Sequence, residues 1–531
     1  MHPSPPSAAY CPHSKIIYTP SPHAPQVGYT QPSLETRQDA MGPAPAPSFL
    51  SSSSSSQKQK SNSSALRPDQ LRTDLENFPA PLVLPDDDLA LDPEYPPQSF
   101  QEWVDEEERN GLTARRRTVY VLGPPGGDGD GDGDGDSSSV GVEVASWTRP
   151  QKTGSKSEPD MIAFAETQDV VEYLSAFYHG LPVKQLTLAN WKFTSWDEPK
   201  PGATKRSTTT KRRKTAKTPQ SIGLATPTEC IRIRTRPCPD SVYSHQLNLD
   251  DLLDAAISIL PKDAYALCML VHHDLFEDDD DTFVCGRAYG GSRVAVVSTA
   301  RYHPGLDGIQ GIQEGHAWPA AHCQAYVEDT CRAAGAVGKK RKKGSSASHP
   351  QASRNPNGAN RLLEAALAAY TNPTNTNTSS TGLNPEDGTP LWLFRTARTI
   401  SHELGHCFGI DHCVYYACIM QGSASLSEDT RQPPYLCPVD LAKVLAATGA
   451  SVVERDRALL RFCEREGWRD DPGFRAFAAW LRASLELLEV GVEGCEGRDE
   501  GGEVDKKSRS GTGSALITES WKRIWEDLDD E

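Results

Sequence analysis

Hydrophobic positions recur with a regular period through the middle of this chain and become sparse toward both ends. Runs that alternate, or that are continuously apolar, predict strands at 118–122, 230–235, 265–272, 283–287 and 293–302. Spacings of three and four residues predict helices at 170–178, 249–260, 362–370, 439–447, 452–466 and 474–488. The pattern therefore predicts an α/β (α+β) fold whose C-terminal part is mostly helical.

One further helix is predicted from the stripe that ends at residue 408. The apolar residues that form its stripe are Leu393, Ala397, Ile400, Leu404 and Phe408. His402 and His406 are four residues apart, so they lie one turn apart on a face that points away from the stripe. Such a helix packs on a core and presents both imidazoles to a cleft. Gly409 suits the left-handed residue that often ends a helix.

The same stretch has the spacing H-E-x-x-H-x-x-G-x-x-H, with His412 as the last histidine. A zinc site for hydrolysis needs three ligands and one open position. His402 and His406 supply two ligands, and after the turn at Gly409 the chain brings His412 back as the third. Glu403 is placed to act as general base on a water molecule at the metal. This spacing is the metzincin signature and predicts a zinc hydrolase.

The residues that follow resemble those of the archaemetzincin family. Cys413, Cys418 and Met420 form the run H-C-x4-C-x-M, and Cys437 follows after a gap. The resemblance implies a twisted mixed sheet with an active-site helix, and a zinc metallopeptidase that acts on peptide or protein substrates. It also implies a Met-turn at Met420 and a second zinc held by four cysteines, with Cys413, Cys418 and Cys437 at the first three positions.

The fourth position departs from the family pattern, because the sequence reads Cys437-Pro-Val-Asp440. An aspartate can bind zinc, so a site of three cysteines and Asp440 is one interpretation. A weakened or empty second site is another. Asp440 also lies where a helix begins, and there its carboxylate can serve as an N-terminal cap.

Two other expectations concern the substrate and the reaction. Metzincins bind extended substrate along an antiparallel strand beside the cleft, and by that resemblance Val294 to Thr299 is the expected edge strand. The alternatives to a peptidase are a catalytically silent zinc scaffold that binds partners, and a zinc hydrolase acting on another bond. The presence of Glu403 argues against the scaffold, because a purely structural site has no use for a general base.

His316 and His322 have no partner in ligand spacing and are interpreted as structural or surface residues.

Composition limits the number of folded domains in the 531 residues. Proline and glycine number 41 each, and only 37% of residues are hydrophobic. We expect a disordered Pro/Ser-rich region at 1–75 and one catalytic domain at 76–490 with low-complexity inserts at 126–139, 201–220 and 338–358. Residues 491–531 are expected to form a linker and an amphipathic tail helix.

Charge and cysteine content limit which binding partners and which cellular compartment we expect. The net charge of -17 argues against nucleic acid as a partner of the whole chain. No apolar run approaches the roughly 18 residues of a membrane span, and the first residues lack the pattern of a secretory signal. The 13 cysteines therefore favour free thiols and metal ligands. Basic runs at Lys211–Lys214 and Lys339–Lys343 are either nuclear-import signals or solvated loops, so we expect an intracellular, cytoplasmic or nuclear protein.

Overall fold

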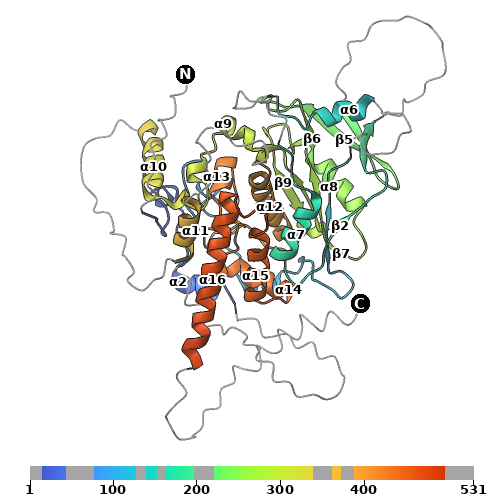
Figure 1. The fold of residues 1–531 in the computed structure, drawn as a ribbon. Helices are drawn as coiled ribbons and strands as arrows, with labels where there is room; N and C mark the ends of the chain where they lie inside the picture. The colour runs from blue at the N-terminus through green and yellow to red at the C-terminus, as the bar shows by residue number, and fades with distance from the viewer. Residues whose placement is uncertain are drawn as a thin grey trace, which may run out of the picture.

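The structure is a computed structural model that describes residues 15–42, 77–126, 139–151, 162–196, 220–338, 361–371 and 388–496. Its centre is a five-stranded sheet with the order β2-β1-β7-β10-β9 (Figure 1). The strands are β1 (Thr118–Leu122), β2 (Val183–Leu186), β7 (Ala264–Val271), β9 (Gly286–Tyr289) and β10 (Val294–Ser298). β9 pairs antiparallel with β10, and the other pairs are parallel. Every residue of β7 is buried, as a central strand requires.

A second sheet has the order β3-β4-β5-β6-β8. It consists of β3 (Lys192–Ser195), β4 (Ser221–Ala225), β5 (Cys230–Pro237), β6 (His245–Asn248) and β8 (Asp274–Phe276). Its pairs are antiparallel except for β6 with β8. The two sheets together confirm the predicted mixed α/β architecture.

Helices cover both faces of the central sheet. On one face lie α7 (Thr167–Phe177) and α12 (Gly388–Cys407), whose apolar residues share a core with Val119 and Val297. On the other face α8 (Leu249–Ser258) shares a core with Leu267 and Val296. Alternate residues of each strand thus enter opposite cores, as the pleat of a strand dictates.

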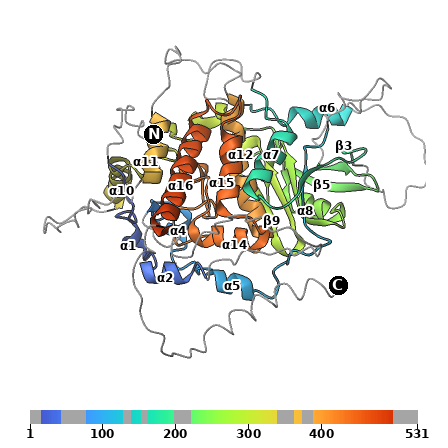
Figure 2. The ribbon, with the colours of Figure 1, turned by 60° about the horizontal axis from the view of Figure 1, so that its bottom comes forward.

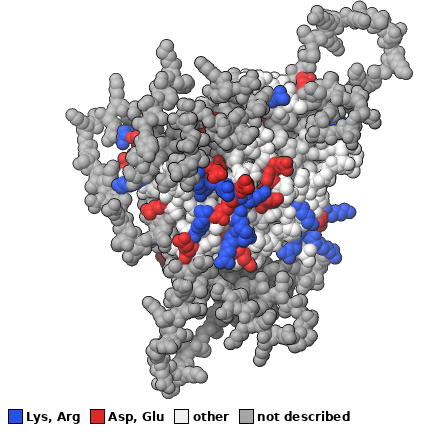
Figure 3. Space-filling model, viewed as in Figure 1, with Lys and Arg blue, Asp and Glu red and all other residues white. Residues whose placement is uncertain are grey.

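The predicted stripe of α12 is confirmed. Leu393, Ala397, Ile400, Leu404 and Phe408 are all at most 2% exposed. On the side of α12 away from the sheet, α15 (Val452–Cys463) and α16 (Pro472–Glu496) pack side by side (Figures 1 and 2). Figure 3 shows acidic and basic side chains intermixed on the face seen in Figure 1. Among the ion pairs of the described residues, Arg465 pairs with Glu172 and Arg482 pairs with Glu464. These pairs are exposed, so each contributes little to stability.

Shorter elements complete the described part of the chain. The remaining helices are α1 (Ala24–Val27), α2 (Leu34–Asp39), α4 (Asp88–Leu91), α5 (Phe100–Asp105), α6 (Ser139–Ser146), α9 (Asp307–Gln310), α10 (Gln324–Gly338), α11 (Arg361–Thr371), α13 (Leu426–Arg431) and α14 (Pro438–Thr448). Figure 2 shows α5 beside α14, although more than 300 residues separate them in the sequence. Among the described residues, no helix combines the length and the apolar character needed to cross a membrane.

The prediction that Val294 to Thr299 forms the edge strand was wrong. β10 lies between β7 and β9, so Val294 to Thr299 is an inner strand and β9 is at the edge. The turn Gly290–Ser292 reverses the chain and places β9 outside β10. The strand predicted at 283–287 is correspondingly shifted to Gly286–Tyr289. An apolar run reveals a strand but not which of its neighbours will be on the outside.

The extent of the folded region also differs from the domain expected at 76–490. Residues 15–42 fall in the region expected to be disordered, yet they form α1 and α2 and bury Ala24 and Tyr29. Tyr29 donates to the carbonyl of Val414 (2.7 Å), which is a tertiary contact that composition does not reveal. α16 continues to Glu496, past the expected linker start at 491, because single glycines only weaken an established helix. The rest of 1–75, the interiors of the three inserts, both basic runs and the tail helix lie outside the described residues.

Candidate metal centre

The three histidines of the motif converge at the C-terminal end of α12. His402 and His406 lie one helical turn apart, and their Nε2 atoms are 3.1 Å apart. The helix ends at Cys407, and Gly409 follows two residues later with a φ of 74°, in the left-handed region. The turn brings back His412, so that one nitrogen from each of the three rings lies within 4.8 Å of the others. The predicted ligand set is therefore assembled in space.

Backbone carbonyls fix the orientation of the two helical histidines. Nδ1 of His402 lies 2.8 Å from the carbonyl oxygen of Ile419, and Nδ1 of His406 lies 2.7 Å from that of Ile410. A carbonyl oxygen only accepts, so each Nδ1 carries the proton and donates it. Each Nε2 then has a lone pair available for a metal. In metal-binding histidines the other ring nitrogen typically donates to a carbonyl or carboxylate, as Nδ1 does here.

The surroundings also keep the imidazoles neutral. Burial lowers the pKa of His402 well below its usual value, and the neighbouring His406 and His412 add to the effect. Burial likewise lowers the pKa of His406 and that of His412, the latter to about 4. Three uncharged nitrogen donors that point toward one another suit a zinc ion, for which ligand nitrogens on a tetrahedral centre lie ~3.3 Å apart.

Glu403 faces the same space as the three histidines. A cleft of about 1100 Å³ is lined by all four side chains together with Arg287 and other residues. Burial raises the pKa of Glu403 to about 8, while Arg287 and a hydrogen bond from the backbone N–H of Ala288 act in the opposite direction. Edge strand β9 thus holds the carboxylate through Ala288. Arg287 and Ala288 were missed by the sequence analysis, because nothing in an apolar strand pattern marks a contact with Glu403.

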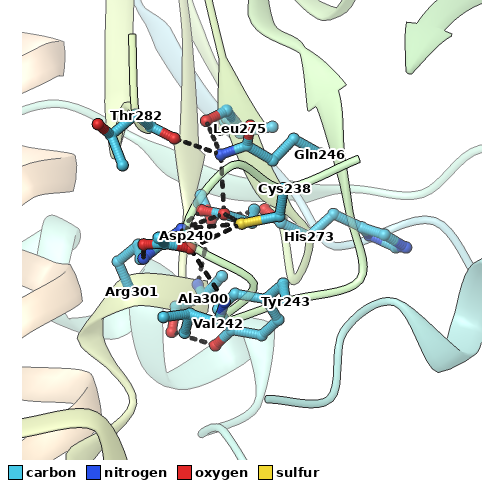
Figure 4. A network of polar contacts seen from close by, with 12 residues as sticks. Cys238, Asp240, Val242, Tyr243, Gln246, His273, Leu275, Thr282, Ala300 and Arg301 are labelled. Carbon is cyan, nitrogen blue, oxygen red and sulfur yellow. Dashed lines mark hydrogen bonds and ion pairs between the residues drawn. The ribbon is translucent and has the colours of Figure 1, made fainter. Parts of the chain in front are cut away.

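A buried polar network forms another wall of this cleft (Figure 4). Arg301 is 1% exposed and pairs with Asp274 (2.5 Å) and Asp240 (2.7 Å). Cys238 also donates to Asp240 (2.9 Å). Burial acts to raise the pKa of Asp240, but hydrogen bonds from Arg301 and Cys238 outweigh burial and lower this pKa to about 2. The wall therefore carries a fixed, ionised carboxylate.

Met420 packs directly against α12. It is fully buried, and a methyl group at Gly405 would lie only 2.4 Å from its sulfur. Its carbonyl accepts from the backbone N–H of Cys413 (2.8 Å). Gly405 precedes His406, so the sulfur supports α12 between the two helical histidines. This is the position expected of a Met-turn.

The cysteine-rich segment forms a second cluster. Cys413, Cys418, Cys437 and Asp440 are buried, and their sulfur and oxygen atoms lie within 4.8 Å of one another. The sulfurs of Cys413 and Cys437 are 3.5 Å apart, and Asp440 Oδ2 lies 3.3 Å from the sulfur of Cys418. Sulfurs on a tetrahedral zinc are spaced ~3.8 Å apart, so this donor set also fits the ion.

The contacts of Asp440 favour the ligand interpretation over the cap. Oδ2 faces the sulfurs, and Oδ1 accepts from Nζ of Lys443 (2.9 Å). α14 has Cys437 at its N-cap, and the backbone N–H of Cys437 donates to the sulfur of Cys418 (3.2 Å). Burial raises the pKa of Asp440 to about 7, and Lys443 opposes that rise.

His316 and His322, which were interpreted as structural or surface residues, belong to neither cluster. His322 is 1% exposed, and its Nε2 lies 3.2 Å from the carbonyl oxygen of Ala80. The structure instead adds residues that the sequence analysis passed over, namely Tyr95, Gln98 and Lys443. Tyr95 lines the cleft, with its ring 5.6 Å from that of His412.

The sequence of this chain is similar to those of known proteins. Residues 382–444 match the model of Peptidase family M54. Human archaemetzincin-2 is 30% identical over 234 residues, which is 44% of this chain and about half (51%) of the relative. Archaemetzincin-2 of Pongo abelii is 25% identical over 395 residues, covering 74% of this chain and 76% of the relative.

A solved archaemetzincin from Methanopyrus kandleri is 15% identical and covers 62% of this chain and 95% of its own. The TM-score between the two structures is 0.25. Residues 382–444 hold both clusters and match Peptidase family M54, and the chain is similar to archaemetzincins.

Proposed function

We propose that this protein is a zinc metallopeptidase that hydrolyses peptide bonds, with zinc held by His402, His406 and His412. The observation that supports this most strongly is the convergence of three neutral imidazoles on one wall of a cleft that also contains Glu403. The nitrogen separation and the bonded Nδ1 atoms fit the metal. Three protein ligands leave one coordination position open for chemistry.

Glu403 is the proposed general base. It accepts a proton from the attacking water and passes it to the nitrogen of the leaving amine. A bound zinc ion supplies Lewis acidity, which polarises the scissile carbonyl and acidifies water. Burial raises the pKa of Glu403 to about 8 although Arg287 and the Ala288 N–H oppose the rise, and a bound cation would favour the ionised form. The Ala288 N–H holds the carboxylate in place while the proton moves.

Edge strand β9 is the proposed binding element for an extended peptide. Gly286, Arg287 and Ala288 line the cleft beside Glu403. An edge strand can add a further strand through its backbone groups. We therefore transfer to β9 the role that was first expected of Val294 to Thr299.

We further propose that Cys413, Cys418, Cys437 and Asp440 hold a second zinc with a structural role. The four donors are buried together, which is the closed arrangement of a structural site. Such a metal links the loop after His412 to the start of α14 and contributes to folding directly.

A peptide-library cleavage assay tests the proposed activity. The wild-type protein is assayed at measured zinc content, after removal of zinc with a chelator, and after zinc is restored. We expect cleavage that disappears with the metal and returns with it. Zinc-loaded protein that cleaves no peptide of the library, while its zinc content matches the proposed sites, would instead indicate the catalytically silent scaffold.

A further inference from the structure

Lys443 is a lysine without access to water. It lies on α14 one turn after Asp440 and is 1% exposed. Its ammonium group donates to Oδ1 of Asp440 (2.9 Å), to the backbone carbonyl of Gln98 (2.8 Å) and to Oε1 of Gln98 (2.8 Å). An ammonium has three donors, so all of them are used. Buried lysines are rare, and this one is fully engaged by only two residues.

Gln98 extends these contacts to the turn between α12 and His412. It precedes α5, and its Nε2 donates to the carbonyl of Gly409 (3.0 Å). Its Oε1 accepts from the backbone N–H of Asp411 (3.2 Å) as well as from Lys443. Both backbone groups belong to the turn that leads from α12 to His412. A single amide side chain therefore touches Lys443 on one side and the turn of the third histidine on the other.

A carboxylate needs this support more than a thiolate does. A cysteine offers a metal one sulfur, whereas an aspartate has two equivalent oxygens on a group that rotates. Three thiolates, a carboxylate and a divalent ion carry two excess negative charges, and one buried ammonium removes half of that excess. In this chain Lys443 binds Oδ1, which leaves Oδ2 directed at the sulfurs of Cys418 and Cys437.

We propose that Lys443 and Gln98 are positioning residues: Lys443 orients Asp440 as a metal ligand, and Gln98 couples that second metal site to the turn carrying His412. The proposal rests on the metal-binding role proposed above for Asp440. It assigns a function to residues that lie outside both ligand sets, and it explains how a Cys-x-x-Asp pattern can hold a metal.

Cobalt titration of the chelator-treated full-length protein separates the two sites. Co²⁺ bound by thiolates gives an intense charge-transfer absorption, which a site of three histidines does not give. We expect Lys443→Met to weaken Co²⁺ binding at the thiolate site by roughly 10–100-fold, as for other residues that orient metal ligands. Thr448→Val is the matched control, because Thr448 is also a buried polar residue of α14 and belongs to neither metal-ligand group.

A double-mutant cycle distinguishes orientation of Asp440 from a general structural effect. In an Asp440→Cys background the ligand no longer has two oxygens to orient, so we expect Lys443→Met to cost much less affinity there. Equal losses of Co²⁺ affinity in both backgrounds would overturn the role of Lys443. If wild-type protein shows no thiolate absorption at all, the second metal site itself fails, which is a separate result. Circular dichroism confirms that each variant is folded.

Gln98→Glu tests the coupling. The variant keeps an oxygen for Lys443 but loses the donor to Gly409. We expect the thiolate site to retain Co²⁺, while the histidine site weakens by roughly 10-fold or more. Unchanged metal affinity at the histidine site would show that Gln98 does not couple the two sites.

Discussion

The Nε2 atoms of His402 and His406 face each other at 3.1 Å while each Nδ1 is held by a backbone carbonyl. The apolar stripe on the opposite side of α12 is buried in the core. One face of α12 therefore contributes to stability, and the opposite face carries the proposed metal ligands. Substitutions on the two faces should have opposite consequences.

We expect His402→Ala to lose the catalytic metal and the activity, with little change in the stability of the metal-free protein. Leu404→Ala, on the buried face, should instead destabilise the fold by about 2–5 kcal/mol, because it opens a cavity in a close-packed core. Zinc content of folded protein and denaturant unfolding of the metal-free forms measure the two effects. A loss of metal-free stability in His402→Ala as large as that in Leu404→Ala would contradict this division.

The second cluster is expected to raise the zinc content to two ions per chain. Asp440→Ala should lower it to one, and Asp440→Cys should tighten the second ion, because a thiolate is the softer donor. Cys418→Ser should lower the thermal unfolding temperature, since structural zinc contributes folding free energy. Metal analysis and calorimetry measure these changes. A wild-type content of one zinc, lost in His402→Ala, would show that the second site is empty.

Gly405 and Met420 should be coupled. A methyl group at Gly405 would approach the Met420 sulfur to 2.4 Å, so the side chain must move. We expect Gly405→Ala to destabilise the protein by about 1–3 kcal/mol, although alanine is the better helix former. The smaller side chain of Met420→Ala should relieve part of this cost in the double variant. Additive losses of unfolding free energy would indicate that the two residues do not interact.

Asp240 should make stability depend on pH. Its pKa is about 2 in the folded protein, below the usual 3.8, because Arg301 and Cys238 donate to it. A lowered carboxyl pKa stabilises the fold above the unfolded value, and that contribution is lost as pH falls from about 4 toward 2. Asp240→Asn should therefore be less stable than wild type at neutral pH, with a difference that shrinks over this range.

Thermal unfolding across that pH range, with exposed Asp279→Asn as control, measures the difference. A gap between wild type and Asp240→Asn that stayed constant down to the lowest pH would argue against an ionised Asp240 as its source.

Periodicity and motif spacing predicted the parts of the site that are local in sequence. The stripe of α12, its two histidines and the turn at Gly409 follow from spacings within about one helix. The long-range contacts were beyond reach of such patterns. Lys443 meets Gln98 across 345 positions, and Tyr29 meets Val414 across 385. The order of strands was missed for a similar reason, because the outer place of β9 depends on the turn at Gly290–Ser292 and on tertiary pairing.

Comparison of wild type with Glu403→Gln at equal zinc content tests the proposed chemistry most directly. The amide is nearly isosteric with the carboxylate, and residue 403 is not one of the three proposed ligands, so metal and fold should be retained. Peptide turnover should fall by roughly 10²-fold or more, because the amide cannot accept the proton of water. Zinc-replete Glu403→Gln that turns over peptide at the wild-type rate would contradict the assignment of Glu403 as general base.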